Sequence, residues 1–234
     1  MTIEIQQPTE RFVTDLGWLD SKHSFNFGDH WSPEHQGHGL LLVNNDDLVA
    51  PATGFGTHGH RDMEIVTWVL SGTLEHHDSA GHHGLLYPGL AQRMSAGTGI
   101  RHSEKNPSAD DPVHFVQMWV QPDTAGVEPG YEQKDINDAL AAGGLVAIAS
   151  GKNHPTAVKI HQRDAVLWGA RLRAHETVTL PDDQHVHAFV AIGDGRLSTG
   201  EELAEGAAAR LTAAGSREFT AGGSGAELLV WATA

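Results

Sequence analysis

The apolar residues of this chain fall in short runs that are separated by polar turns. Seven runs rich in Val, Leu, Ile and Trp are the length of a strand and are bounded by Gly, Pro, Asn or Asp: 39–45, 63–72, 114–122, 145–151, 166–172, 186–195 and 226–233. Short runs of this composition between turn residues are typical of antiparallel strands. The pattern therefore predicts an all-β protein, a sandwich or a barrel, with few short helices.

Two segments have helical features. Residues 135–142, DINDALAA, begin with the possible capping residues Asp135 and Asn137 and are followed by a Gly-Gly pair, which predicts a short helix. Residues 201–215 are rich in Ala and Glu, so a helix and a surface excursion between strands are equally compatible with them.

The helix at 135–142 also marks the expected domain boundary. It follows the loop-like segment 121–133, and apolar strands resume at Leu145. We therefore expect a first domain over residues 1–135 and a second over 136–234. The two halves share a rhythm of strand, turn and strand with little residue identity, so an internal duplication is plausible without being demonstrated.

Charge and composition exclude several classes of protein. The 15 basic and 30 acidic residues give a formal charge of −15, which argues against direct binding of nucleic acid or anionic lipid. The absence of cysteine removes disulfides, thiolate catalysis and cysteine-based metal sites. No leader pattern or run of about 18 apolar residues occurs, so we expect a cytoplasmic protein without a membrane span.

Histidine is over-represented, and four side chains form two pairs with strand spacing. The chain has 17 histidines. His58 and His60 occur in GFGTHGH, and His102 and Glu104 occur in GIRHSEK. Residues i and i+2 of a strand point to the same face, so two such pairs on neighbouring strands converge. Three imidazoles and one carboxylate suit Fe, Mn, Co, Ni or Zn, and the donor set does not choose among them.

One alternative is that these pairs alternate outward on a solvated strand, as one His-x-His pair could do by chance. Two pairs, each preceded by a Gly-containing turn, favour the metal site. In the nearby sequence His76-His77-Asp78, adjacent residues alternate between faces, so at most one of the two histidines points inward.

These motifs carry a resemblance to the cupin superfamily and, within it, to the pirin family, especially its bacterial quercetin 2,3-dioxygenase-like branch. The segments that carry it are 18–31, 45–47, 55–79, 94–107 and 130–133. The resemblance is close over about the first 135 residues and rests on length and rhythm beyond them. It implies a bicupin fold, two tandem antiparallel β-barrels of the jelly-roll type, with the metal in the first barrel.

The resemblance also carries the ligand roles to His58, His60, His102 and Glu104, with iron as the expected divalent metal. Glu64 is the position that an ordinary cupin motif would use. It lies four residues beyond His60, about 13 Å along an ideal strand, so we place it in the pocket wall or behind the ligands. In the second half, His185 and His187 have no matching carboxylate or second histidine pair, so we expect that barrel to be metal-free and structural.

Aromatic residues complete the expected pocket. Phe25, Phe27 and Trp31 alternate along the first segment, and Trp68 and Trp119 lie in expected strands. Most of them should be core residues. The alternative for one or two is an apolar wall against which a flat aromatic substrate stacks.

Two functions from different classes follow. The first is dioxygenase chemistry on a small aromatic or enolic substrate, which by resemblance is ring opening of the flavonol quercetin by O2 with release of CO. Glu104 would then serve both as ligand and as proton acceptor. The second is a non-catalytic redox or metal sensor that binds a partner enzyme or a transcription regulator.

Overall fold

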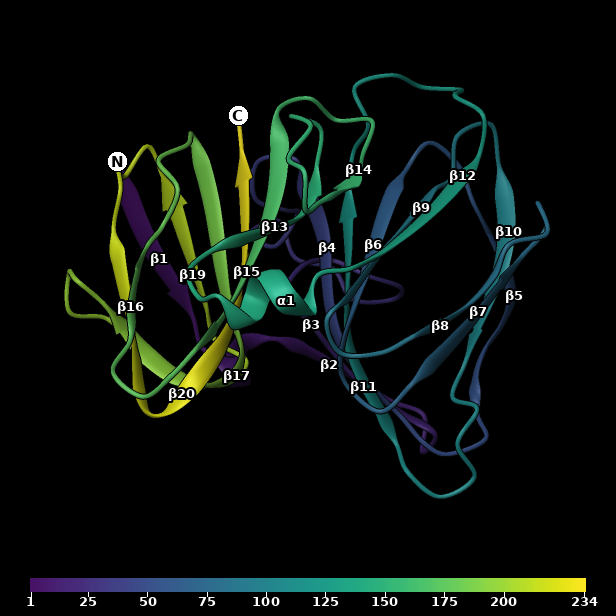
Figure 1. Ribbon diagram of the computed structural model, residues 1–234, viewed down its shortest axis with the longest axis horizontal. Coiled ribbons are helices and arrows are strands. Elements are labelled where there is room, and N and C mark those ends of the chain that lie inside the picture. Colours follow the sequence, from purple (N-terminus) through teal and green to yellow (C-terminus); the bar gives the residue numbers. More distant parts are fainter.

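The computed structural model describes all residues, Met1–Ala234, and its regular secondary structure is almost entirely β-strand, arranged in three sheets (Figure 1). Strands of the N-terminal half form a seven-stranded and a four-stranded sheet. Strands of the C-terminal half form a nine-stranded sheet, which the first strand of the chain joins. The short helix α1, Asn137–Ala141, lies between the two halves (Figure 1).

The seven-stranded sheet holds most of the N-terminal core. Its order is β12 (Gly130–Asp135), β9 (Leu90–Ser95), β6 (Glu64–Ser71), β11 (Val113–Val120), β4 (Leu41–Val49), β3 (Leu19–His23) and β2 (Phe12–Asp15). All of its neighbouring strands are antiparallel. In β6 every residue from Glu64 to Leu70 is buried, as expected for a strand covered on both faces.

The four-stranded sheet carries the histidine motifs. Its order is β5 (Gly54–His60), β10 (Ile100–Lys105), β7 (Leu74–Asp78) and β8 (His83–Leu86). Burial alternates along β10, where Ile100, His102 and Glu104 are buried and Arg101 and Lys105 are exposed. One face of this sheet therefore points into the protein and the other into solvent.

The nine-stranded sheet combines residues from both ends of the chain. Its main path is β1 (Thr2–Gln6), β19 (Ala208–Thr212), β17 (His185–Leu197), β20 (Glu218–Thr233), β15 (Ala165–Leu172), β13 (Val146–Ser150) and β14 (Val158–Lys159), with β16 (Thr177–Thr179) on β20 and β18 (Glu202–Leu203) on β17. Only β13 and β14 pair in parallel. In Figure 1, β1 lies beside β19, far in sequence but adjacent in space. A 3-10 turn, η1 (Pro8–Glu10), leads from β1 to β2.

The largest hydrophobic core joins the two halves. It contains 23 buried residues. Trp68 and Val116 come from the seven-stranded sheet, and Leu229 and Trp231 come from the nine-stranded sheet. A second core of 19 residues lies within the C-terminal half. The two halves therefore bury apolar surface against each other, which is the main favourable contribution to folding.

The strands and the short helix expected from the apolar pattern are confirmed. Each of the seven apolar runs overlaps a strand, and α1 lies within residues 135–142. The helix is followed by Gly143 and Gly144, both with positive φ of 87° and 77°, a conformation that favours glycine at the end of a helix. No helix of the structure has the length and apolar character needed to cross a membrane.

The expectations for residues 201–215 were wrong. This segment contains β18 and β19, so it is neither a helix nor a surface excursion. Ala207, Ala209 and Leu211 are buried in the C-terminal core, and β19 pairs with β1 on one side and β17 on the other. Burial and strand pairing thus outweigh the small helix preference of alanine.

The structure does not confirm closed barrels. The three sheets are open, because in none of them do the two outermost strands pair with each other. Alternating apolar residues and turn residues identify strands, but closure also depends on tilt and register, which the pattern does not contain. The domain boundary between residues 135 and 136 stays a prediction.

Candidate metal centre

The antiparallel pairing of β5 with β10 brings the two histidine motifs together. His102 lies directly opposite His58, and Ile100 lies opposite His60. The register shifts by a bulge between His102 and Glu104, which changes the direction of the strand after His102. The expected convergence of the three histidines is therefore present in the structure.

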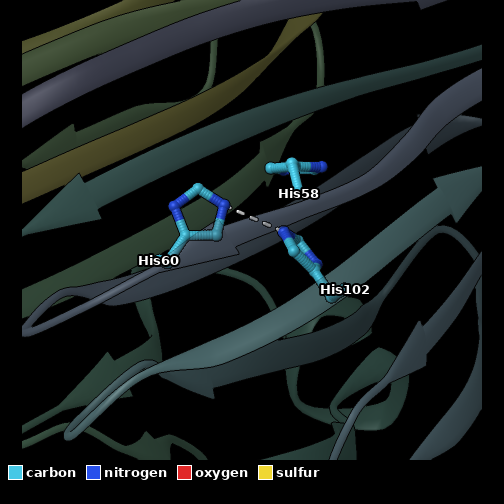
Figure 2. Close-up of side chains that lie close together, drawn as sticks. All are labelled: His58, His60 and His102. Atoms are coloured by element: carbon cyan, nitrogen blue, oxygen red, sulfur yellow. Dashed lines mark hydrogen bonds between the residues drawn. The ribbon is translucent and has the colours of Figure 1, made fainter.

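Three imidazole rings face one another at this place (Figure 2). The ring centroids of His58 and His102 are 4.4 Å apart, and those of His60 and His102 are 4.9 Å apart. The Nε2 atoms of His60 and His102 are 3.0 Å apart. Two nitrogens bound at right angles to a cation at about 2.1 Å would be separated by about 3.0 Å. This spacing fits a shared metal ion.

The electrostatics of the cluster favour neutral imidazoles. Burial lowers the pKa of His60 to about 3, helped by the neighbouring His102 and His58. Burial also lowers the pKa of His102 to about 3, helped by His58 and His76. Only neutral imidazole has a lone pair for a metal, so at neutral pH these side chains are ready to bind one.

A backbone contact orients His58. Its Nδ1 lies 2.8 Å from the carbonyl oxygen of Gly56, and a carbonyl only accepts hydrogen bonds. The proton therefore sits on Nδ1 and the lone pair on Nε2. Orienting contacts of this kind are characteristic of metal-binding histidines. Taken together, the donors present fit a divalent metal ion.

Glu104 is buried, and on β10 it lies opposite Phe55 of β5 and His76 of β7. Its carboxylate forms a compact group with His102 and His76, within 4.8 Å, whereas the group of His58, His60 and His102 does not include it. Gln117 Nε2 donates to Glu104 Oε2 at 2.8 Å. Burial raises the pKa of Glu104. Whether Glu104 completes the donor set stays a proposal, which we take up below.

His76 is a neighbour of the site that the sequence analysis did not assign. It lies opposite Glu104 on β7 and is 1% exposed, whereas His77 is exposed. The expectation that at most one of the two points inward is confirmed. Strand alternation from the buried Leu74 would have identified His76 as the inward one.

Glu64 is not in the wall of the cavity, which was one of the two places expected from the sequence. The chain leaves β5 after His60, turns at Asp62 with a φ of 46°, and enters the seven-stranded sheet at Glu64. Glu64 accepts a hydrogen bond from Ser95 Oγ at 2.8 Å and contacts His161 Nδ1 at 3.2 Å. Its contacts therefore tie the N-terminal sheet to the C-terminal half, and it is not among the residues that line the cavity beside the histidines.

A cavity of about 660 Å³ reaches the histidine cluster. Its apolar wall includes Val13, Leu16, Leu19, Phe27, Phe55 and Trp119, and its polar wall includes His23, His30, Asn45, Asp47, His58, His60, Glu104 and Gln117. Small-molecule sites have volumes of roughly 300–1,000 Å³ with mostly apolar walls and few polar groups. The cavity has the size of a binding site for a small organic molecule.

The aromatic residues singled out in the sequence are found both in the core and in the cavity wall, the two locations expected for them. Phe25 and Trp68 are buried in the core shared by the two halves, whereas Phe27 and Trp119 line the cavity. Their rings meet edge to face at 5.5 Å, and Trp119 also meets His60 edge to face at 4.9 Å. Trp31 is instead 71% exposed.

Asp47 is, with Glu104, the second buried acidic residue of the cavity. It is buried, and its carboxylate accepts a hydrogen bond from the hydroxyl of Ser21. Burial raises the pKa of Asp47 to about 7. The sequence supports the family resemblance at residues 45–47, but it does not show that Asp47 faces a cavity, because a carboxylate in a strand can point to either face.

The histidine pair of the C-terminal half has a different environment. His185 Nδ1 lies 3.0 Å from the carbonyl oxygen of Ala234. His187 is buried against Phe25, with ring centroids 5.4 Å apart, and neither of its ring nitrogens has a hydrogen-bond partner. The expectation that this half has a purely structural role stays a prediction.

Comparisons with known protein families match both halves of the chain. The family described as Pirin matches residues 6–120, and the family described as quercetinase C-terminal cupin domain matches residues 147–231. The first match contains the histidine cluster, and the second contains most of the nine-stranded sheet.

Individual relatives agree with these matches. A Mycobacterium tuberculosis protein that carries quercetin 2,3-dioxygenase as a provisional name is 56% identical over 231 residues, covering 98% of this chain and 94% of the relative. Quercetin 2,3-dioxygenase from Escherichia coli K12 is 40% identical over 189 residues, covering 81% of this chain and 77% of the relative. The crystal structure of the E. coli bacterial pirin YhhW in complex with nickel(II) superposes with a TM-score of 0.90 at 34% identity, covering 98% of both chains.

Proposed function

Because the chain belongs to the pirin family of the cupin superfamily, we propose that it is a metal-dependent quercetin 2,3-dioxygenase. The reaction would open the central ring of a flavonol with O2 and release CO. The observation that carries the proposal is the convergence of three imidazoles at a cavity of about 660 Å³. The E. coli relative named quercetin 2,3-dioxygenase supports the same activity.

In this proposal, His58, His60 and His102 hold one divalent cation and Glu104 supplies the fourth donor. Iron is the metal that we propose first, with Ni, Mn, Co and Zn as alternatives of the same donor chemistry. The nickel(II) complex of an E. coli pirin supports a divalent cation. When bound, the cation supplies Lewis-acid polarisation of a substrate oxygen and redox chemistry with dioxygen.

The cavity wall positions the substrate. Trp119 stands edge-on to both His60 and Phe27, so a flat aromatic molecule packed against it lies next to the imidazoles. Val13, Leu16 and Leu19 continue the apolar wall. Aromatic and aliphatic contacts of this kind hold the substrate rings and exclude water from the reacting oxygen.

Glu104 accepts the proton of the substrate hydroxyl in this scheme. Its carboxylate lines the cavity and is held by Gln117. A buried carboxylate is a stronger base than an exposed one, and the deprotonated substrate oxygen is the better ligand. Glu104 would thus combine binding and proton transfer at the same place.

The test is incubation of metal-loaded protein with quercetin, separately with each candidate metal, under air and without oxygen. We expect loss of the flavonol absorbance and release of CO only when both metal and O2 are present. His58→Ala removes one imidazole and should abolish the reaction. His83→Ala, an exposed histidine on β8, is the matched control and should leave it unchanged.

Metal-loaded wild-type protein that leaves quercetin intact under air would contradict this function. A pull-down from cell extract then tests the alternative, a metal sensor that binds a protein partner. A partner that binds wild-type protein and is lost with His58→Ala would support sensing.

A further inference from the structure

We propose that Asp78 and His76 act as positioning residues, which fix the protonation of His102 so that its Nε2 lone pair faces the metal site. This inference deepens the proposed function, and it rests on the proposed metal site. The chain of contacts runs from Asp78 through His76 to His102, behind the ligand and away from His60.

Asp78 is the fixed end of the chain. Its side chain is fully buried, and its Oδ1 atom accepts hydrogen bonds from the backbone N–H groups of Ala80 at 2.9 Å and His82 at 3.0 Å. These bonds belong to the turn between β7 and β8. An ionised carboxylate can only accept hydrogen bonds, so Oδ2 is an acceptor for the two imidazoles that contact it, His82 Nδ1 at 3.0 Å and His76 Nε2 at 3.3 Å.

His76 contacts both Asp78 and His102 and so connects them. Its Nε2 lies 3.3 Å from Asp78 Oδ2, and its Nδ1 lies 3.5 Å from His102 Nδ1. Because Asp78 accepts, His76 carries its proton on Nε2 and has a lone pair on Nδ1. That lone pair favours a proton on the facing Nδ1 of His102, which is 3.5 Å away.

The proton on His102 Nδ1 determines the state of the other ring nitrogen, Nε2. A neutral imidazole has one protonated and one unprotonated nitrogen. With the proton on Nδ1, Nε2 has its lone pair directed at His60 Nε2, 3.0 Å away, where the cation would bind. Both His76 and His102 are 1% exposed, so water is not available to replace the relay.

Asp78→Asn is the sharpest test. The amide oxygen takes the place that accepts from Ala80 and His82, so the NH2 group is placed toward His76 and donates to its Nε2. The relay then runs in reverse, His102 carries its proton on Nε2, and that nitrogen cannot bind a metal. Loss of orienting contacts typically costs 10- to 100-fold in metal affinity, and we expect a loss of about that size.

Metal affinity and the protonation of His102 can both be measured without an assay of enzymatic activity. Competition with a chelator gives the affinity for Ni²⁺ and Fe²⁺. The ¹⁵N shifts of the imidazoles in metal-free protein identify which nitrogen of His102 is protonated, and we expect Nδ1 in wild type and Nε2 in Asp78→Asn. Thermal unfolding monitors folding of each variant.

His76 variants provide the second test. His76→Gln keeps one donor and one acceptor and should retain more affinity than His76→Leu, which keeps neither. Lys105→Leu, at an exposed position of β10, is the control and should bind metal like wild type.

The failures of the two proposals are distinguishable. Wild-type protein that binds no divalent metal overturns the metal site of the proposed function. Wild-type protein that binds metal while folded Asp78→Asn binds it within threefold, or a wild-type His102 protonated on Nε2, overturns the positioning role alone.

Discussion

Two buried glutamates, Glu64 and Glu104, show how much one residue's environment decides its role. Both are nearly inaccessible, at 1% and 3% exposure. Glu64 contacts Ser95 and His161, whereas Glu104 contacts Gln117 and lines the cavity beside His58. The first therefore joins the halves of the protein, and the second stands where substrate and cation would meet.

Substitution separates these roles. We expect Glu104→Gln to lower metal affinity at least tenfold, because it replaces a charged donor by a neutral amide. Glu64→Gln should leave metal affinity unchanged and lower the free energy of unfolding by about 1–3 kcal/mol, the usual cost of disturbing a buried hydrogen bond. Chelator competition and urea unfolding measure the two effects. Equal metal affinity in both variants would argue against Glu104 as a donor.

For single residues, the sequence predicted that the three histidines come together, but it did not predict the position of Glu64. Alternation along a strand placed His58, His60 and His102 correctly, since they lie on the two paired strands. It could not place Glu64, because the turn at Asp62 moves the chain into a different sheet. It also left His76 unassigned, since its contact with His102 depends on the pairing of β10 with β7.

At the scale of elements, the close approach of β5 and β10 is the feature on which the histidine cluster depends. A Cβ atom at Gly54 would lie 2.3 Å from the carbonyl oxygen of Glu104 and 2.6 Å from Cα of Lys105. The φ of Gly54 is 150°, which residues other than glycine rarely adopt. Gly54 therefore allows the two strands to pair at the end next to Glu104.

Gly54→Val should force the strands apart and disturb the ligand geometry. We expect a loss of metal affinity together with a lower melting temperature. Gly56→Val, on the same strand with open space around its Cα, is the control, and a melting temperature as low as that of Gly54→Val would show that close approach is not the cause. Thermal unfolding and chelator competition provide the comparison.

Strands and helices were predicted correctly from the sequence where their signals are local in the chain. The strand-length runs and α1 were assigned correctly because their apolar spacing and bounding turns are local. Residues 208–212 were not, because their alanines become strand residues only by packing in the C-terminal core and pairing with β1 and β17.

At the scale of the whole molecule, the protein has the mostly β, two-domain fold of the pirins, with the contact between its halves containing polar groups as well as apolar core. Trp68 Nε1 donates to Glu227 Oε1 at 2.7 Å, and Arg171 contacts the same carboxylate. His187 packs there against Phe25 and His38. Its two ring nitrogens have no partner.

His187 should make the contact between the halves sensitive to acid. Burial lowers the pKa of His187 well below its usual value, and Arg210 and His38 lower it further. The folded protein thus keeps His187 neutral, while the unfolded chain takes up a proton below about pH 6.5. Stability from this residue is therefore present above pH 6.5 and is lost as the pH falls. Between pH 7.5 and 5.5 the loss is about 1.4 kcal/mol.

Urea unfolding at these two pH values measures the loss. His187→Phe removes the titrating group without breaking a hydrogen bond, so its free energy of unfolding should fall less on acidification by about that amount. His83→Gln, at an exposed position on β8, should behave like wild type. An unchanged acid response in His187→Phe would exclude this residue as its source.

The pairing of β1 with β19 has a consequence for biosynthesis. Thr2 pairs with Thr212, and Gln6 pairs with Ala208, so during synthesis β1 meets its partner strand only after some two hundred further residues have been added. Contacts so distant along the chain slow folding, because a long loop must close before they form. The C-terminal sheet can thus gain its edge strand β1 only after β19 has been synthesised.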